Sequence, residues 1–321
     1  SWEIEKKSNF GIDMGLFRGR VDITADYFHN RREDILIQRV TIPTATGFRQ
    51  NPWQNFGVTT NEGFDASITV KHNIGKDWVL SARGNVTYAV NKIIEKDEIP
   101  QAYPWLAQTG TSIGTNKIYV AEGLFTNQDF IITEKSDGSY NYKLKDGIAT
   151  YAADVKPGDI KYKDLNNDKV INEFDRTVIG GDKPYSYFGI DLGFKWRGLD
   201  FSMFWQGAYN RDLYLQDWTL LEGFQANGRY YGQAYENMLG RWTPETAESA
   251  TFPRLTAGGN EYNRGNGWNS SFWLRSGNFI RLKDISLGYN LPDSFCNNYL
   301  GGLRLKIFVN GQNLFTKSAC D

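Results

Sequence analysis

The chain is poor in cysteine and has no long apolar run. Cys296 and Cys320 are the only cysteines among 321 residues, and they form no paired spacing. A disulfide framework or a zinc site therefore has little support, and free thiols are the simpler interpretation. No run of about 18 apolar residues occurs, which excludes a membrane-spanning helix but is compatible with a membrane barrel made of strands.

The chain also lacks an excess of either charge and lacks common catalytic motifs. It has 36 basic and 37 acidic residues, a net charge of −1 and no basic run, so nucleic acid is not an expected partner. No Gly-x-Ser-x-Gly elbow, His-Glu-x-x-His motif or phosphate-binding glycine loop is present. His29 and His72 fall on expected strands, where a structural role is favoured. Nothing selects two carboxylates as a glycosidase pair, so we expect no enzyme activity.

The apolar residues that are present alternate with polar ones. The chain is 40% hydrophobic and 15% aromatic, yet its mean hydropathy is −0.52. Alternation is clearest between residues 185 and 210, where Arg197-Gly198 separates two segments with one apolar and one largely polar face each. Such alternation predicts a β-hairpin. About 11 residues per strand, at about 3.3 Å per residue and a tilt of about 40°, would be roughly 25 to 30 Å tall, similar to a membrane hydrocarbon layer.

Three further hairpins follow the same pattern, over residues 9–27 (with a return strand that continues toward residue 37), 64–91 and 284–310. About eight strands result, with short turns inside hairpins and long connections between them, at about residues 38–56, 92–184 and 211–277. Structureless loops beyond about 15 residues are uncommon in compact soluble domains. Short turns on one side and long loops on the other are typical of a transmembrane barrel, with the long loops extracellular.

The aromatic residues of the strands agree with a membrane barrel. They lie near opposite ends of the apolar faces, where interfacial girdles form. These residues are Trp78, Tyr88, Phe188, Trp196, Phe201 and Tyr209. The alternative is a soluble sandwich with ordinary core aromatics, but it does not explain the many Asp, Lys, Arg, Asn and Ser residues on the opposite faces. A water-filled lumen explains them.

Several motifs resemble a known family. The run from Pro157 to Asn172 (PGDIKYKDLNNDKVIN) is followed by Asp175-Arg176, Ile179-Gly180 and Pro184. It resembles a characteristic stretch of the SusC/RagA family of TonB-dependent outer-membrane transporters from Bacteroidota. Similar matches, in family order, are Asn9-Phe10-Gly11-Ile12-Asp13 with Leu16-Phe17, Glu122-Gly123-Leu124-Phe125, residues 282–289 with Leu291-Pro292, and Asn313-Leu314-Phe315-Thr316.

The resemblance implies an all-β fold, in which this chain is an antiparallel part of a transmembrane barrel of about 22 strands. Residues 1–321 would all belong to that one barrel domain. It also implies an N-terminal plug, which we expect to be absent from this chain, and the end at 317–321 departs from the family pattern. The implied partners are a SusD-like lipoprotein, TonB acting through the missing part, outer-membrane lipid, and a glycan or peptide substrate.

A calcium-loop pattern lies inside the family run. Ca²⁺ prefers six to eight oxygen ligands, and the spacing of a calcium loop wraps them around one point. The candidate ligands are Asp164, Asn166, Asp168, Val170 (through its carbonyl), Asn172 and Asp175. Lys169 stands where such loops normally have Gly, and the last ligand is Asp instead of Glu. The alternative is a turn stabilised by Asx hydrogen bonds without metal.

The long connections contain aromatic residues that are candidates for substrate binding, because flat rings stack on sugars. They are Tyr103, Trp105, Trp218, Tyr230, Tyr231, Trp268 and Trp273. The alternative is that they pack the loops against each other or against the lipoprotein.

We therefore expect part of an outer-membrane importer for oligosaccharides or oligopeptides. A passive porin-like channel, a soluble carbohydrate-binding or glycosidase β domain, and an adhesion role for the long loops are the alternatives.

Overall fold

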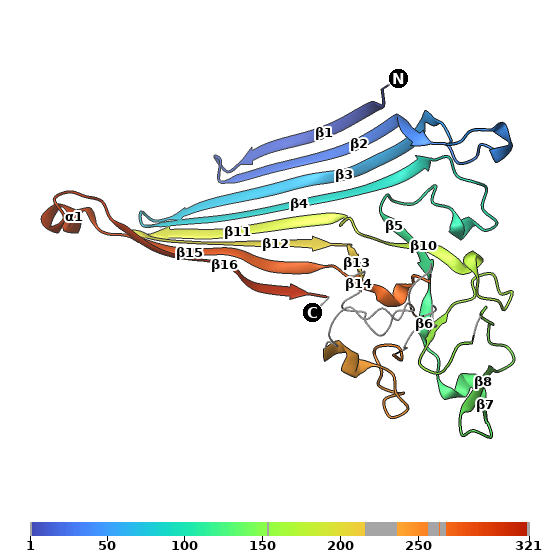
Figure 1. Ribbon diagram of the computed structural model, residues 1–321. Coiled ribbons are helices and arrows are strands. Elements are labelled where there is room, and N and C mark those ends of the chain that lie inside the picture. The colour runs from blue at the N-terminus through green and yellow to red at the C-terminus, as the bar shows by residue number, and fades with distance from the viewer. Residues whose placement is uncertain (1, 153, 216–235, 256–262, 264–267, 320–321) are drawn as a thin grey trace.

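The computed structural model describes residues 2–152, 154–215, 236–255, 263 and 268–319. Its main feature is one antiparallel sheet of eight strands in the order β1-β2-β3-β4-β11-β12-β15-β16 (Figure 1). The strands are β1 (Ile4–Leu16), β2 (Val21–Gln38), β3 (Trp53–Ile74), β4 (Trp78–Glu95), β11 (Ser186–Trp196), β12 (Leu199–Tyr209), β15 (Phe279–Asn290) and β16 (Lys306–Ser318). The predicted strands and hairpins are confirmed, and each strand pairs with its sequence neighbour within the sheet.

Several strands are longer than the alternation indicated. β3 has 22 residues and β2 has 18, because near the long connections polar residues occupy both faces and the hydrophobic signal fades. The last strand begins at Lys306 and reaches Ser318, whereas alternation stops near Val309. The register of β15 and β16 shifts between Leu282 and Asp284, opposite the Gln312-Asn313-Leu314-Phe315 segment. This bulge interrupts the alternation.

One hairpin turn contains a helix that the sequence analysis did not predict. Between β15 and β16, where only a turn was expected, α1 spans Asp293–Tyr299. Seven residues are too few for a helical period to be recognised. Gly302, at φ 85°, ends the helix by donating its N–H to the Cys296 carbonyl over 3.0 Å. Cys296 is a buried free thiol, and Cys320 lies outside the described residues.

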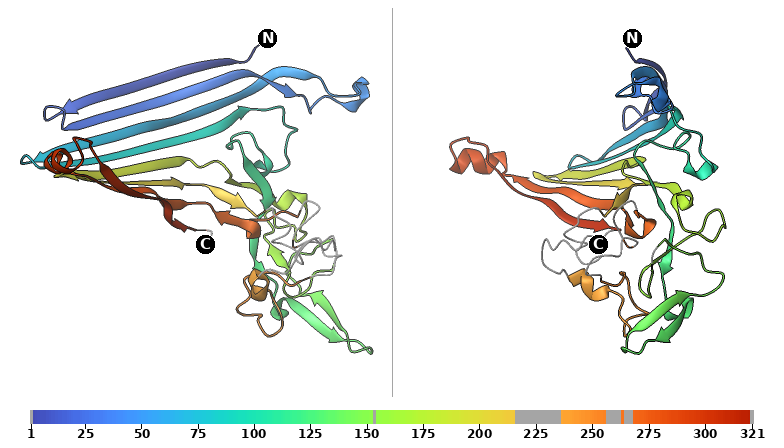
Figure 2. Two further views of the ribbon diagram at one scale, coloured as in Figure 1. Left: turned by 60° about the vertical axis from the view of Figure 1, so that its left-hand side comes forward. Right: turned by 45° about the vertical axis from the view of Figure 1, so that its right-hand side comes forward.

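The described parts of the two longest connections fold into a separate mass at one end of the sheet, opposite the α1 turn (Figures 1 and 2). We call its described residues, 96–152, 154–184, 211–215, 236–255, 263 and 268–278, the loop body. It contains four two-stranded ladders: β5 (Thr115–Tyr119) with β10 (Arg176–Gly181), β6 (Ala121–Leu124) with β9 (Ile160–Tyr162), β7 (Phe130–Glu134) with β8 (Tyr140–Leu144), and β13 (Asp212–Tyr214) with β14 (Leu274–Ser276). β5 and β8 lie inside the long connection predicted at about residues 92–184.

Six 3₁₀ turns complete the described elements: η1 (Thr44–Thr46), η2 (Pro104–Leu106), η3 (Asn127–Asp129), η4 (Glu173–Asp175), η5 (Glu236–Gly240) and η6 (Ser271–Trp273). Among the described residues, no helix is both long and apolar enough to cross a membrane.

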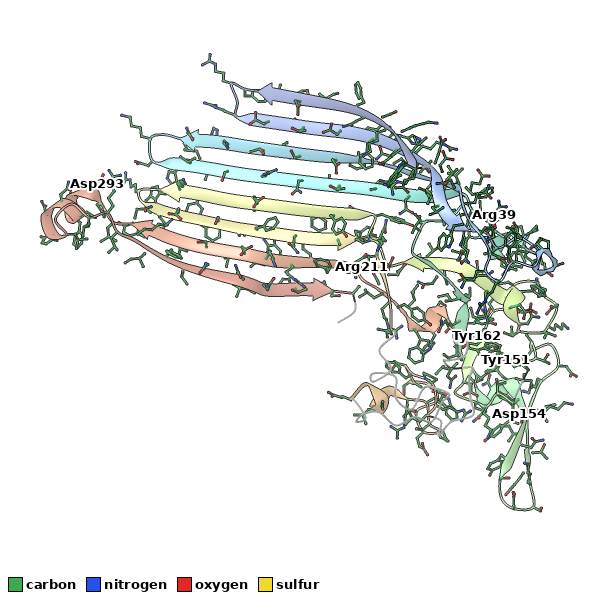
Figure 3. All side chains as sticks on the ribbon, turned by 45° about the horizontal axis from the view of Figure 1, so that its top comes forward. Arg39, Tyr151, Asp154, Tyr162, Arg211 and Asp293 are labelled. Atoms are coloured by element: carbon green, nitrogen blue, oxygen red, sulfur yellow. The ribbon has the colours of Figure 1, made fainter. Side chains whose placement is uncertain are left out.

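The buried core lies in the loop body and not against the sheet. Its larger cluster consists of Tyr119, Ile160, Tyr162, Ile171, Met238 and Trp273. A smaller cluster contains Phe125, Phe130 and Val155. Figure 3 places Tyr151 and Tyr162 in this mass, away from the long strands. The loop body therefore has the anatomy of a small globular domain, while the sheet leaves most of its large apolar residues exposed.

Candidate membrane-facing and substrate-facing surfaces

The strand register places the apolar side chains on one face of the sheet. Directly paired residues share a face, so the partners across five neighbouring strands form one row: Ile12, Ala25, Ala66, Val86 and Phe188. In the described chain no layer covers this face of the sheet. Phe10 and Ile190, in rows on either side of this one, are 69% and 40% exposed. A contiguous apolar face of this kind marks a contact with lipid or with another protein.

Two aromatic rows border this apolar face. In the row nearer the loop body, Phe10, Tyr27, Phe64 and Tyr88 are consecutive cross-strand partners. Ser186 of β11 pairs with Tyr88, and Tyr209 of β12 pairs with Ser186. The row nearer the short turns runs through Trp78, Trp196, Leu199 and Tyr289. Within the rows, the Phe64 and Tyr88 rings stack at 5.8 Å and the Trp78 and Trp196 rings stack at 5.2 Å. Phe188 and Phe201, which were also predicted as girdle residues, lie on the same face but one row closer to the middle of the apolar band.

The separation of the two rows matches a membrane. Trp78 and Tyr88 lie ten residues apart in β4. At about 3.3 Å per residue this is about 33 Å along the strand, or about 25 Å when the strand is tilted by about 40°. Outer-membrane barrels have an apolar band about 25 Å tall between aromatic girdles. The two rows therefore have the spacing of membrane interfaces.

The opposite face carries polar rows in the same register. One row is Asp13, Thr24, Ser67, Asn85 and Gly189, and another is Asp22, Thr69, Arg83 and Asp191. Nearer the loop body, Lys7, Asn30, Asn61 and Asn91 are paired. There a cavity of about 350 Å³ is lined by Glu5, Arg32 and Lys183 together with these asparagines. Amides and charges of both signs suit hydrogen bonding to a hydrated, polar solute.

The family-like run beginning at Pro157 organises the loop body. Asp159 is fully buried, and its carboxylate accepts hydrogen bonds from Arg254 Nε at 2.7 Å, Asn263 Nδ2 at 3.1 Å and the Lys156 N–H at 2.8 Å. Gly158 has φ +87°, and a Cβ there would lie 2.6 Å from Trp242 Cδ2. Only glycine fits this position. Sequence reasoning missed these roles because Arg254 and Asn263 lie about a hundred residues away without any local signal.

The candidate calcium loop has the backbone hydrogen bonds of an Asx-stabilised turn. Asp164 Oδ2 accepts from the Lys169 N–H at 2.8 Å, and Asp168 Oδ1 accepts from the Val170 N–H at 2.8 Å. Lys169 adopts φ 63°, the left-handed conformation for which glycine is usual at this position of a calcium loop. The side chain at this position therefore does not prevent the sharp turn.

Two observations bear on whether the loop fits Ca²⁺. Asp164 Oδ1 is buried and has no hydrogen-bond partner within the described residues, so one carboxylate oxygen is available to a cation. The described residues contain no cluster of three or more His, Cys, Asp or Glu side chains arranged to hold a metal. Amide and carbonyl oxygens of Asn166, Val170 and Asn172 would thus have to supply part of the coordination, as Ca²⁺ accepts.

Asp175 closes this loop from a buried position. Its two oxygens accept the Leu165 N–H at 2.9 Å and the Asn172 N–H at 2.8 Å. Burial is the main cause that raises the pKa of Asp175, and the Asp164 and Asp168 carboxylates raise it further. The two backbone N–H donors oppose this shift without cancelling it.

Tyr103 and Trp105 lie against the calcium loop. Their rings stack at 4.6 Å, Trp105 Nε1 donates to the Phe174 carbonyl at 2.8 Å, and Asn166 Nδ2 donates to Tyr103 Oη at 3.4 Å. Both side chains are half-buried, so these contacts favour the packing role over an open sugar platform.

Trp268 and Trp273 belong to the core of the loop body. Trp268 stacks on Tyr119 at 4.7 Å. Trp273 is fully buried, and its Nε1 donates to the Asn263 carbonyl at 2.7 Å. With no exposed ring face, Trp273 packs the core instead of making the predicted contact with substrate. Trp218, Tyr230 and Tyr231 lie outside the described residues.

Comparison with known proteins identifies the family. The family model "TonB dependent receptor-like, beta-barrel" matches residues 1–196, and the chain belongs to this family of outer-membrane transporters and receptors. TonB-dependent receptor P3 of Formosa agariphila is 26% identical over 98% of this chain and 30% of its own length. TonB-dependent receptor SusC of Bacteroides thetaiotaomicron is 22% identical over 98% of this chain and 28% of its own. The SusC/RagA resemblance is confirmed.

Solved structures show the same fold. The structure described as the RagAB peptide transporter matches with a TM-score of 0.66 and 20% identity, over 99% of this chain and 32% of that chain. The RagAB peptide importer in the 'closed-closed' state also gives a TM-score of 0.66, with 22% identity. The eight-stranded sheet thus corresponds to part of a TonB-dependent transporter barrel, as predicted. The chain spans about 30% of the length of its first relative.

Proposed function

We propose that the chain forms part of the wall and of the extracellular loops of an importer for oligosaccharides or oligopeptides. The observation that carries this proposal is the two-faced sheet, with aromatic rows spaced for a bilayer on its apolar face and amide and charged rows on the other. β1 and β16 lie at the two ends of the strand order and offer edges for further barrel strands. Transport, and not catalysis, is the activity assigned.

The loop body is proposed to face the outside of the cell. Barrels of this class have short turns on the periplasmic side and long loops outside, and here all long connections leave the same end of the sheet (Figure 1). A SusD-like surface lipoprotein would cover this end and hold substrate against it. The SusC relative and the two-component name RagAB support such a partner.

Energy would come from TonB, acting across the periplasm on a plug domain of the whole protein. The polar rows would line the passage once the plug moves. This dependence separates an importer from a passive porin-like channel, which would admit solute without TonB.

The test uses the full-length protein in its own cells. Gly138, in the turn between β7 and β8, and Gly75, in the turn between β3 and β4, are each replaced by cysteine. A membrane-impermeant maleimide should label G138C and leave G75C unlabelled until the outer membrane is opened. Substrate uptake should stop when TonB is deleted. Labelling of G75C alone, recovery without detergent in the soluble periplasm, or uptake that persists without TonB would contradict the proposal.

We further propose that the loop from Asp164 to Asp175 binds one Ca²⁺, which would cross-link the loop against Tyr103 and Trp105. The left-handed Lys169 and the unpaired Asp164 Oδ1 support this. Calorimetric titration of the intact protein with Ca²⁺ should give one saturable event, and Asp164→Ala should abolish it. Asp137→Ala is the matched control, because Asp137 also accepts a backbone N–H, from Ser139, but in a separate hairpin. Absence of heat in the unaltered protein would remove the site.

A further inference from the structure

A cavity of about 590 Å³ lies where the loop-side ends of β11, β12 and β15 meet the loop body. We call it the rim cavity. Tyr185 directly precedes β11, Asn210 directly follows β12, and Asn278 directly precedes β15. The other wall includes Gly110, Ser112 and Gly181. Asn210 continues the polar series of β12, so the rim cavity stands at the loop-side end of the surface that would line the passage. Figure 3 labels Arg211 at this junction.

Arg211 stands out among the arginines of the loop body. Arg254 is paired with Asp159 at 2.7 Å, and the guanidinium of Arg176 lies 5.0 Å from the centre of the Tyr119 ring. Arg176 Nε and Arg211 Nε are both buried without a hydrogen-bond partner, but among the described residues Arg211 has neither a ring contact nor a carboxylate within salt-bridge distance. The Arg211 residue as a whole is half-buried, and a guanidinium drawn partly out of water normally has a partner.

The rest of the rim cavity is less able to bind a charged group. The Ser112 hydroxyl donates to the Asn91 carbonyl at 2.7 Å, and Asn278 Oδ1 accepts the Arg211 N–H at 3.3 Å. Asp212, the one acidic residue of the lining, accepts the Gly181 N–H at 3.2 Å. Arg211 is the one cation among the described residues of the lining.

We propose that the rim cavity is a subsite for a carboxylate of the imported solute, held by Arg211. The planar fork of a guanidinium matches a carboxylate in two parallel hydrogen bonds. The carboxylate could belong to an acidic peptide or to a uronic-acid sugar. Both are polar oligomers of the kind proposed above, so this inference rests on the importer assignment and narrows its substrate class.

The test compares each acidic probe with its neutral twin on the full-length transporter assembled with its lipoprotein. The peptide probe is an acidic oligopeptide, and its twin has Gln for Glu and an amidated C-terminus. The sugar probe is an oligogalacturonide, and its twin is the methyl ester. Arg211→Met removes the charge while keeping the aliphatic chain that packs on Gly277, where a Cβ would lie 3.2 Å from Arg211 Cγ.

R211M should weaken binding of the recognised acidic probe by at least about tenfold to a hundredfold, because this is the value of one charge-assisted hydrogen bond and the guanidinium would make two. Its neutral twin should bind weakly and equally to both proteins. Arg304→Met, at the far end of the sheet on a side chain 88% exposed, is the matched control and should change nothing. The probe that responds identifies the source of the carboxylate.

A second variant avoids any dependence on the stability of R211M. Gly181 lines the rim cavity and a Cβ there would have no atom within 4 Å, so Gly181→Leu should narrow the cavity and weaken binding of the same probe. Equal binding of acidic and neutral twins, no binding of either acidic probe, an unchanged R211M, or an equal loss in R304M would overturn the subsite. TonB-dependent uptake, measured in the same strains, tests the importer assignment separately.

Discussion

The sheet and the loop body use apolar residues in opposite ways. In the loop body, Trp273, Ile160 and Phe125 are fully buried, and a buried ion pair connects distant segments. In the sheet, apolar side chains stand exposed, and order comes from cross-strand pairing over eight strands. The two regions are therefore suited to different solvents. The loop body buries its apolar side chains away from water, whereas the sheet exposes them on the face that contacts lipid. Substitutions should therefore affect the two regions separately.

The largest expected effect is in the loop body. Asp159→Ala leaves Arg254 without its carboxylate partner, and breaking a buried pair in this way costs about 3 to 5 kcal/mol. Limited proteolysis of the loops should become fast, while the heat-dependent gel mobility of the intact barrel stays unchanged. Asp77→Ala breaks the exposed pair with Arg197 and is the control, with an expected cost of about 0 to 1 kcal/mol. Loss of the barrel in D159A would contradict the separation of the regions.

The next effect contrasts neighbouring residues of β3. Ile68 pairs with Gly84, between the two aromatic rows, while Ser67 pairs with Asn85 on the polar face. Ile68→Arg should destabilise the folded barrel in vesicles by about 2 to 4 kcal/mol, because it places a charge in the apolar band. Ser67→Arg should be nearly neutral. Urea unfolding followed by tryptophan fluorescence measures both, and equal effects would show that neither face contacts lipid.

A smaller effect concerns Gly158, within the loop body. Gly158→Ala forces a Cβ toward Trp242 in a left-handed backbone, which should cost about 1 to 3 kcal/mol. Gly138 also has positive φ, but a Cβ there meets open space. Gly138→Ala is therefore the control for backbone strain alone. Proteolysis rates of the two variants give the difference, and an equal rate would mean that the Trp242 contact contributes nothing.

The smallest effect is a pH dependence from Asp175. Its pKa is raised above the usual 3.8, so the folded loop favours the protonated acid. This contribution to stability is complete below the unfolded-state pKa and is lost as the pH rises through the raised value. Ca²⁺ requires the carboxylate and should therefore bind more weakly once the pH falls below that raised value. Asp175→Asn should remove this pH dependence of loop proteolysis measured without Ca²⁺, and persistence in the variant would assign it elsewhere.

The sheet was predictable and the interior of the loop body was not. In a strand between lipid and water, apolar and polar residues alternate, as Ile68 and Ser67 do, so eight strands and their pairing into four hairpins could be predicted. The Asp159 to Arg254 contact joins residues that only the tertiary fold brings together, and Trp273 looks the same in sequence whether it packs a core or binds a sugar. Helix α1 was too short to show a period. The rim cavity is formed by strand ends and loop residues that are far apart in the sequence, so no motif indicated it.

The central claim is that the apolar face of the sheet contacts lipid and the polar face contacts water. Spin labels placed singly at positions 64–71 of β3, in the full-length protein reconstituted in a bilayer, test it directly. Oxygen collisions should be frequent at Phe64, Ala66, Ile68 and Val70, and a water-soluble nickel reagent should reach Asp65, Ser67, Thr69 and Lys71. The reverse alternation, or access of the nickel reagent to every position, would contradict the claim.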